Sequence, residues 1–425
     1  MSVKDVNFWI EGDISTTRVV SRLLDDMLGE GNCHTQLLRT VDWRSLAKRL
    51  NIFCRVCDPS YKWLPAYMSK RGISYVYYID DNFWRITGES DLAKYYQAND
   101  VVTSLDEFVR YSSLVMTHSQ ALADFVAYRF PDVKCVLLKA PFDMSLAKEE
   151  LQHIPPRVKK GAVVGYAGGY KREEFELLEE VISKLDVKRP EIRFEFIGGV
   201  SKRLRKFKNV QWFPGLSDYA AYISFKISRR WSVGLGPLLE SEFNASKTDN
   251  KFREYGGCRI PGIYSDTGPF AESVTPDVMG LLVRNKADDW VAAIERLIDD
   301  EALHESIAQA AFTYVDSTYS HEAISPSWNE ALSIDRGKAA SSWRDCVRFR
   351  CAKLFYVHST VNEIATLEKM STASLAWRGF KSQALSFVMR KRKHVTFFGS
   401  VVLLVLLFIT MMNANLYFIR ATWLG

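Results

Sequence analysis

Residues 162–199, with the sequence AVVGYAGGYKREEFELLEEVISKLDVKRPEIRFEFIGG, contain the pattern that decides the fold. An apolar run at 162–167 leads into Gly168 and Gly169. Apolar residues at helical spacing follow over 173–185, and a second apolar run at 193–197 ends in another pair of glycines. Short apolar runs that alternate with a helical pattern are typical of parallel strands joined by a helix. We therefore predict a strand–helix–strand unit, with the first glycine turn at the carboxyl end of its first strand.

The same alternation continues on both sides of this unit. Toward the C-terminus it predicts strands at 210–213, 232–235, 262–264 and 281–283, and helices at 251–255, 290–297 and 301–314. Toward the N-terminus it predicts strands at 6–10, 51–56, 75–79, 114–117 and 134–138, and helices at 16–28 and 119–130. Such alternation favours parallel sheets covered by helices on both faces.

A polar segment divides the pattern into two halves. Residues 149–161, EELQHIPPRVKKG, contain two adjacent prolines and a short basic run, which is typical of a linker. We therefore predict an α/β protein with two tandem Rossmann-like, doubly wound domains. They are expected at residues 1–150 and 160–335.

The composition excludes several classes of protein. The chain has 425 residues, of which 47% are hydrophobic and 25% charged, so it is not disordered, collagen-like or a coiled coil. The net charge of +6 is unevenly distributed, because residues 341–394 contain eleven Lys/Arg and three Asp/Glu. Residues 1–340 are left with a net charge near −3. A mildly acidic body argues against nucleic-acid binding through phosphate contacts.

The most apolar stretch lies near the C-terminus. Residues 395–419 contain no charged side chain, and 25 helical residues would cross a hydrocarbon core of about 30 Å. The basic run at 390–393 precedes this stretch and favours a cytoplasmic position before it. We therefore predict a single-pass C-terminal transmembrane helix at 395–419, preceded by a basic cytoplasmic linker at 338–394.

The body of the chain is expected in the cytoplasm. The first apolar run, at 6–10, is interrupted by Glu11 and Asp13, so no signal peptide is predicted. Seven cysteines fit a reducing compartment. Cys54 and Cys57 have the spacing of half a zinc site, but no second pair completes it, so two half-buried strand cysteines are the favoured interpretation.

Two stretches could bind an anion. Gly168 and Gly169 would let backbone N–H groups approach a phosphate, with Lys171 beside the turn. Farther along, Lys247 and Lys251 are four residues apart, so one helix would present both on one face, as a diphosphate requires. Glu254 could accept hydrogen bonds from a ribose diol. The structural alternative is a solvated helix with a Lys/Glu pair.

The predicted first domain has its own candidate functional residues, which lie at the ends of strands. Asp80 and Asp81 follow the strand at 75–79, and His118 follows the strand at 114–117. Adjacent carboxylates could bind a divalent metal, cap a helix, contact an acceptor hydroxyl or act as a general base. A metal is disfavoured because one residue separates the two aspartates of a metal-binding DxD motif, whereas Asp80 and Asp81 are adjacent. His118 is either a group that handles a proton on the acceptor side or a structural histidine.

The sequence resembles the family-four glycosyltransferases, which have the GT-B fold and include surface-polysaccharide enzymes. The run KTDNKFREYGGCRIPGIYSD at 247–266 is similar to their donor-binding helix and the strand after it. The resemblance covers roughly residues 5–335. Other stretches similar to the family are GLGPL at 234–238, GPF at 268–270, Glu272, GLLV at 280–283, YIDDNFW at 78–84, HSQALA at 118–123 and Trp328.

The resemblance implies roles for these residues. Lys247 and Lys251 would bind the diphosphate of a nucleotide-sugar donor, helped by the Gly168–Gly169 turn, and Glu254 would hold the ribose. The family usually has a glutamate that contacts the donor sugar eight positions before Glu254, where this chain has Ser246. Lys171 and Asn244 complete the candidate donor-binding set, and Asp80, Asp81 and His118 form the candidate catalytic set.

The expected function is therefore transfer of a sugar from a nucleotide-sugar donor to a lipid-linked or growing glycan acceptor. The reaction would take place at the cytoplasmic membrane face, in surface-polysaccharide synthesis. The resemblance implies a hexosyltransferase that retains anomeric configuration and needs neither metal nor cofactor. Two alternatives stay open: a catalytically degenerate protein that binds nucleotide sugars or serves as a scaffold, and a nucleotide-sugar epimerase. The second is disfavoured by the membrane anchor, and Ser246 keeps the first open.

Overall fold

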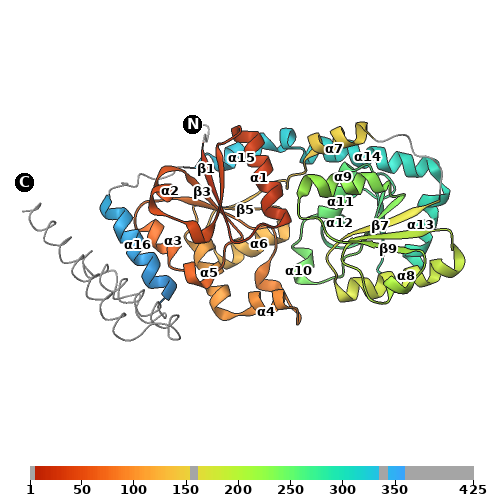
Figure 1. Ribbon diagram of the computed structural model, residues 1–425, viewed down its shortest axis with the longest axis horizontal. Helices are drawn as coiled ribbons and strands as arrows, with labels where there is room; N and C mark the ends of the chain where they lie inside the picture. The colour runs from red at the N-terminus through yellow and green to blue at the C-terminus, as the bar shows by residue number, and fades with distance from the viewer. Residues whose placement is uncertain (1–4, 154–160, 335–342, 359–425) are drawn as a thin grey trace, which may run out of the picture. The chain divides into compact units, whose positions relative to one another are not determined.

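The computed structural model describes residues 5–153, 161–334 and 343–358 (Figure 1). Both sheets of the described chain belong to one compact unit, and a second unit joins α2 (Trp43–Lys48) with α16 (Trp343–His358). Each sheet has six strands, and every pairing within it is parallel. The prediction of two doubly wound α/β halves is confirmed.

The first sheet has the strand order β2-β1-β3-β4-β5-β6. All residues of its central strands are buried, because helices cover both faces of a parallel sheet. The edge strand β2 (CHTQL) is half-exposed and lacks an apolar run, so the sequence pattern did not predict it. The strands are β1 (Val6–Ile10), β2 (Cys33–Leu37), β3 (Leu50–Cys54), β4 (Tyr75–Tyr78), β5 (Leu114–Thr117) and β6 (Cys135–Leu137).

The second sheet has the order β12-β11-β10-β7-β8-β9, in which strand order reverses beside β7. Ligands of open parallel sheets bind beyond the carboxyl ends of the strands at such a reversal. The glycine turn at 168–169 lies at this end of β7, as predicted. The strands are β7 (Val163–Gly168), β8 (Arg193–Gly198), β9 (Val210–Phe213), β10 (Val233–Gly236), β11 (Gly262–Ser265) and β12 (Leu281–Val283).

Helices surround each sheet (Figure 1). Several begin at side chains that cap the first turn, such as Ser119 before α6 and Asp218 before α9. Around the first sheet lie α1 (Ser15–Leu28), α3 (Leu64–Ser69), α4 (Asp91–Gln97), α5 (Asn99–Arg110), α6 (Gln120–Arg129) and α15 (His321–Leu332). Around the second lie α7 (Met144–Gln152), α8 (Arg172–Lys188), α9 (Tyr219–Arg229), α10 (Glu242–Ala245), α11 (Asn250–Gly257), α12 (Gly268–Ser273), α13 (Ala287–Asp299) and α14 (Glu301–Tyr319).

The chain passes between the two cores twice. After β6, Phe142 and the buried residues of α7 already pack in the core of the second sheet, together with α9 and α11. Near the end, α15 returns, and Ile324, Trp328 and Leu332 pack in the core of the first sheet. Trp328 Nε1 donates to the carbonyl of Lys139 at 3.1 Å, so the two crossing segments contact each other. Trp328 thus lies on the segment that returns to the core of the first sheet.

The predicted membrane segment at 395–419 lies outside the described residues, as does most of the predicted linker at 338–394. Of the helices that the structure describes, none combines the length and apolarity that crossing a bilayer needs.

The packing of α11 predicts a position that admits no side chain. A Cβ atom on Gly257 would lie 2.1 Å from Cε1 of Phe142, which is buried in the second core. Helix propensity favours alanine over glycine by about 1 kcal/mol, so any net loss would come from this contact. Gly257→Ala should lower the free energy of unfolding by about 1–3 kcal/mol in urea denaturation. The control is Gly12→Ala, whose Cβ would have nothing within 4 Å. Equal effects of the two changes would contradict the packing.

Candidate functional site

A cavity of about 480 Å³ lies at the carboxyl ends of strands from both sheets. Its lining includes the turns after β4, β5, β7, β8 and β10, together with the start of α1 and one side of α11. Nine of the ten residues predicted for the site line it: Asp80, Asp81, His118, Gly168, Gly169, Lys171, Lys247, Lys251 and Glu254. Asn244 does not line the cavity and acts through a neighbour, as described below.

The glycine turn makes room for a lysine. Gly168 has a φ of +153°, and a Cβ atom there would lie 2.9 Å from Nζ of Lys251. Gly198, at the end of β8, has a φ of +98°, and its Cβ would lie 2.7 Å from the Gly168 carbonyl oxygen. Both positions therefore require glycine, because a side chain would strain the backbone and displace the groups around Lys251.

Lys251 extends from α11 to the end of β7. Its Nζ donates to the carbonyl of Ala167 at 2.7 Å and lies 4.3 Å from the ring centroid of Tyr166. Burial, and next the charge of Lys171, lower the pKa of Lys251 to about 7. A bound anion would counter both effects, since it would pair with the ammonium group in place of water.

Lys247 lines the cavity, but it does not lie on a helix as the sequence predicts. It lies in an irregular segment between α10 and α11, so it does not share a helical face with Lys251. The prediction of one helix through both lysines is wrong. α10 ends after Ala245, and α11 begins only at Asn250, where Asp249 accepts from Arg253 at 2.9 Å.

Asn244 orients Lys247. Nζ of Lys247 donates to Oδ1 of Asn244 at 2.6 Å and lies 4.6 Å from the ring centroid of Phe243. Burial, and next the charge of Lys171, lower the pKa of Lys247 to about 8. Lys171 itself pairs with Glu174 at 2.8 Å. Three lysines from separate elements therefore bring positive charge to one region of the cavity.

Glu254, predicted to hold a ribose, has several partners of its own. Lys226, whose side chain is fully buried, forms an ion pair with it, Tyr222 donates to it at 2.7 Å, and Asn250 donates at 3.1 Å. Burial alone would raise the pKa of Glu254, but the Lys226 ammonium and the hydrogen bonds from Lys226 and Tyr222 lower it. The carboxylate is therefore ionised and fixed in place at the cavity wall.

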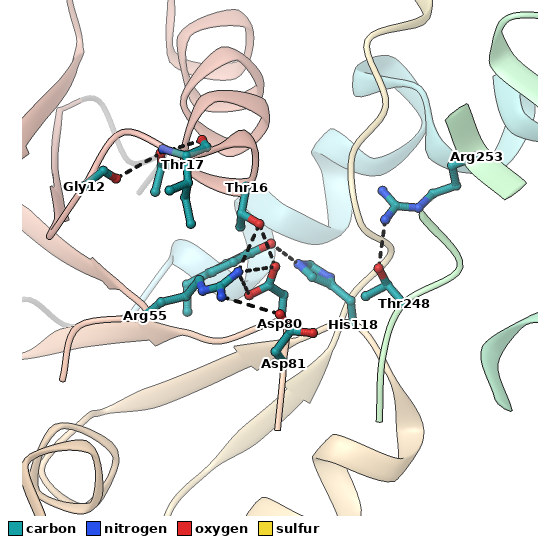
Figure 2. Close-up of polar contacts among 11 residues, drawn as sticks. Gly12, Thr16, Thr17, Arg55, Asp80, Asp81, His118, Thr248 and Arg253 are labelled. Carbon is teal, nitrogen blue, oxygen red and sulfur yellow. Dashed lines mark hydrogen bonds and ion pairs between the residues drawn. The ribbon is translucent and has the colours of Figure 1, made fainter. Parts of the chain in front are cut away.

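The two aspartates share one arginine (Figure 2). Arg55 lies 3.2 Å from Asp80 Oδ1 and 3.5 Å from Asp81 Oδ2, and Thr16 donates to Asp80 at 2.8 Å. Burial, and next the charge of Asp80, raise the pKa of Asp81. Arg55 has a φ of +57°, a conformation that costs energy for a residue with a side chain and that is common at functional sites.

His118 lies in the same group, with both ring nitrogens engaged. Nδ1 lies 2.8 Å from the carbonyl of Leu138, which fixes the proton on this nitrogen. Nε2 therefore accepts from the Tyr78 hydroxyl at 2.7 Å. Burial lowers the pKa of His118 to about 4, so the ring is neutral. In this arrangement it orients the strand ends and has no free nitrogen for an acceptor.

Sequence reasoning missed three charged residues here. Arg55 stands inside the Cys54–Cys57 motif, and its signal is that it directly follows β3. Lys226 lies between Ile223 and Ile227, and a lysine on an apolar helical face is the signal that could have found it. Arg253 is buried, and it donates to the carbonyl of Pro141 at 2.8 Å. It also donates to Thr248 at 3.0 Å (Figure 2).

Among the described residues, no group of His, Cys, Asp or Glu side chains is arranged to hold a metal ion. Cys54 and Cys57 are both free thiols, but they are fully buried rather than half-buried, and only Cys54 lies on a strand, at the end of β3.

Comparisons with known proteins identify the fold. No protein-family model and no curated protein matches the chain. Sucrose-phosphate synthase from Thermosynechococcus elongatus is 14% identical with a TM-score of 0.57, over 77% of this chain and 98% of that one. Anabaena HepE in complex with UDP and glucose is 13% identical with a TM-score of 0.58, over 78% and 99%.

A third solved structure agrees with these two. A point mutant of TarM from S. aureus, in complex with fondaparinux, alpha-GlcNAc-glycerol and UDP, is 15% identical with a TM-score of 0.51. The match covers 67% of this chain and 55% of that one. The chain therefore shares the two-domain GT-B fold of these glycosyltransferases.

The lowered lysine pKa values predict how anion binding depends on pH. Lys251 and Lys247 lose their protons near pH 7 and pH 8, whereas a terminal phosphate, with a second pKa of about 6, is already ionised there. Affinity for a nucleoside diphosphate should fall about tenfold between pH 7 and 8.5 in titration calorimetry. Lys251→Met should flatten this dependence. Affinity that rises with pH would contradict the assignment.

The same pKa values predict the opposite trend for the ligand-free protein. At Lys247 and Lys251, the unfolded chain binds more protons than the folded one between about pH 7 and the ordinary lysine pKa of 10.5. The free energy of unfolding without ligand should therefore receive a stabilising contribution from these lysines as pH rises through this range. Urea denaturation of the wild type and of the Lys251→Met variant, at pH 7 and pH 9, measures this contribution.

Proposed function

We propose that this protein is a glycosyltransferase that moves a hexose from a nucleoside-diphosphate sugar to a glycan or lipid-linked acceptor. The observation that carries the proposal is the cluster of Lys171, Lys247 and Lys251 at the carboxyl ends of the second sheet. These lysines approach a glycine turn from three elements, in a cavity that also contains carboxylates of the first sheet. The UDP present with HepE and TarM supports the same class of donor.

In this proposal, the donor lies along the second half of the cavity. The diphosphate contacts Lys247 and Lys251 together with the backbone at Gly168 and Gly169. Glu254, held by Lys226 and Tyr222, accepts hydrogen bonds from the ribose. Since Glu254 is already ionised and oriented before the donor arrives, its contact with the ribose diol requires little rearrangement.

The chemistry follows from where the charge goes. The bond between the sugar's anomeric carbon and the terminal phosphate oxygen breaks, and its electron pair stays on the diphosphate. Three ammonium groups in a partly buried cavity stabilise this developing negative charge more than water would. An acceptor hydroxyl forms the new bond to the anomeric carbon and gives up its proton. This requires no metal and no cofactor.

The first half of the cavity serves the acceptor. Arg55 and Thr16 fix Asp80, while Asp81 lies within the electrostatic reach of Lys247 and Lys171. Asp81 accepts the hydrogen bond of the acceptor hydroxyl and takes its proton, a task that its raised pKa suits. His118 and Tyr78 support this strand end.

The remaining parts of the proposal rest on the sequence. The charge-free segment at 395–419 and the basic run before it favour a cytoplasmic body anchored in a membrane, where a lipid-linked acceptor of surface-polysaccharide synthesis would lie. The family resemblance favours retention of anomeric configuration, which proton NMR of the first-formed product would test.

The direct test is nucleotide-sugar turnover by the full chain in detergent. We would measure binding and slow hydrolysis of UDP-, GDP- and dTDP-sugars, with and without EDTA. One donor that stabilises the protein and is hydrolysed equally well with EDTA would support a metal-independent transferase. Binding without any turnover would favour the degenerate, non-catalytic alternative. A change of the sugar without release of nucleotide would favour an epimerase.

The lysine cluster gives a sharper prediction. Lys251→Ala should reduce turnover at least 100-fold, because removal of a group that stabilises transition-state charge costs about 10²–10³ in rate. The thermal midpoint without donor should not fall, since burial opposes the charge of this lysine. The control is Lys184→Ala, which removes a half-exposed lysine of α8 outside the cavity. Full activity of Lys251→Ala would exclude the proposed role.

A further inference from the structure

Lys247 lies outside regular secondary structure. It follows α10, which has only four residues, and precedes the first residue of α11 by three positions. A helix of one turn has too few internal hydrogen bonds to be stable alone. Contacts with the rest of the protein must therefore hold the backbone that aims Lys247 into the cavity.

Within its own segment, Lys247 donates hydrogen bonds to Asn244 from both its backbone and its side chain. Its backbone N–H donates to the Asn244 carbonyl at 3.2 Å, and its Nζ donates to Asn244 Oδ1 at 2.6 Å. These contacts fix the side chain relative to α10. They do not fix α10 and Lys247 relative to the cavity.

Two residues of the first half hold the neighbouring peptide. The Ser119 hydroxyl donates to the backbone carbonyl of Ser246 at 2.7 Å, and Asn82 Nδ2 donates to Ser246 Oγ at 3.3 Å. This carbonyl belongs to the peptide bond that joins Ser246 to Lys247. Ser246 is 4% exposed and Asn82 is 2% exposed, so water does not compete for these bonds.

Both residues follow the candidate catalytic residues directly. Asn82 comes after Asp81 at the end of β4, and Ser119 comes after His118 at the end of β5. Neither lines the cavity, so neither is placed to touch a donor. Arg85 also reaches Glu242 of α10 at 3.1 Å, but both side chains are exposed, so this pair contributes little.

We infer that Ser119 and Asn82 are positioning residues for the donor diphosphate, because they hold the Ser246–Lys247 peptide from the first half of the protein. This inference rests on the proposed function and adds that donor affinity depends on residues that never contact the donor. If the two halves separate, the hydrogen bonds from Ser119 and Asn82 to Ser246 break, and the position of Lys247 is no longer fixed. Diphosphate binding and approach of the acceptor-side carboxylates are thereby coupled.

A structural role for Ser119 must be separated from this one. Ser119 also caps α6, since its Oγ accepts from the N–H of Leu122 at 3.2 Å. Ser90 caps α4 in the same way, with a bond of 3.1 Å from Ala93, and does not line the cavity. Ser90→Ala is therefore the matched control for loss of a cap alone.

The experiment is titration calorimetry on the full chain in detergent at pH 7. Ligands are UDP, GDP and dTDP, with inorganic pyrophosphate and the nucleoside of the tightest-binding diphosphate. Ser119→Ala should weaken binding of the diphosphate and of pyrophosphate by about three- to tenfold, the usual effect of one hydrogen bond. Binding of the nucleoside should not change. Asn82→Ala should act in the same direction, and Ser119→Thr should restore most of the affinity.

A double-mutant cycle tests the route through Lys247. In a Lys247→Ala background, Ser119→Ala should cause no further loss of diphosphate affinity, because the group that it positions is gone. Unchanged affinity in Ser119→Ala, equal losses in Ser90→Ala, or fully additive losses with Lys247→Ala would each overturn the inference while leaving the proposed function intact. If the wild type binds neither a nucleoside diphosphate nor pyrophosphate, the proposed function fails and this inference fails with it.

Discussion

The burial of positive charge at one end of the second sheet is the constraint on which the site depends. Lys247 and Lys251 have lowered pKa values because water is withdrawn from them and because Lys171 repels both. A cluster like this is unfavourable in the empty protein, so other parts of the fold must hold it together. The glycines at 168 and 198 leave the necessary space, and Ala167 and Asn244 supply acceptors for the two ammonium groups.

The parallel sheets explain why these groups meet. In each half, the carboxyl ends of the strands face the same edge, so residues far apart in sequence come together there. Because α7 joins the second core and α15 returns to the first, the chain crosses between the halves twice. Two crossings, linked by Trp328 and the Lys139 carbonyl, limit how the strand ends of one half can move relative to those of the other.

The sequence predicts what depends on local pattern and misses what depends on tertiary contact. Apolar runs located the buried strands, and the glycine pair located the turn after β7. The half-exposed strand β2 had no apolar signal. The spacing of Lys247 and Lys251 suggested one helix, but helical structure is interrupted at Ser246. There, contacts with Ser119 and Asn82 replace helical hydrogen bonds. Arg55 and Lys226 were missed because their roles arise from partners distant in sequence. The predicted membrane segment at 395–419 lies outside the described residues.

Arg55 limits the attraction between the aspartates of the first half and the lysines of the second half. Without a cation of its own, the Asp80–Asp81 pair would attract the nearest ammonium groups, and Lys247 is close enough to affect the pKa of Asp81. A lysine paired to an aspartate would be less available to a diphosphate. Arg55 contacts both carboxylates and stacks 4.6 Å from the ring centroid of Phe83, so one of the two negative charges is balanced within the first half. The lysines of the second half then stay available for an anionic ligand. The strained backbone at Arg55 is consistent with a functional role for this residue.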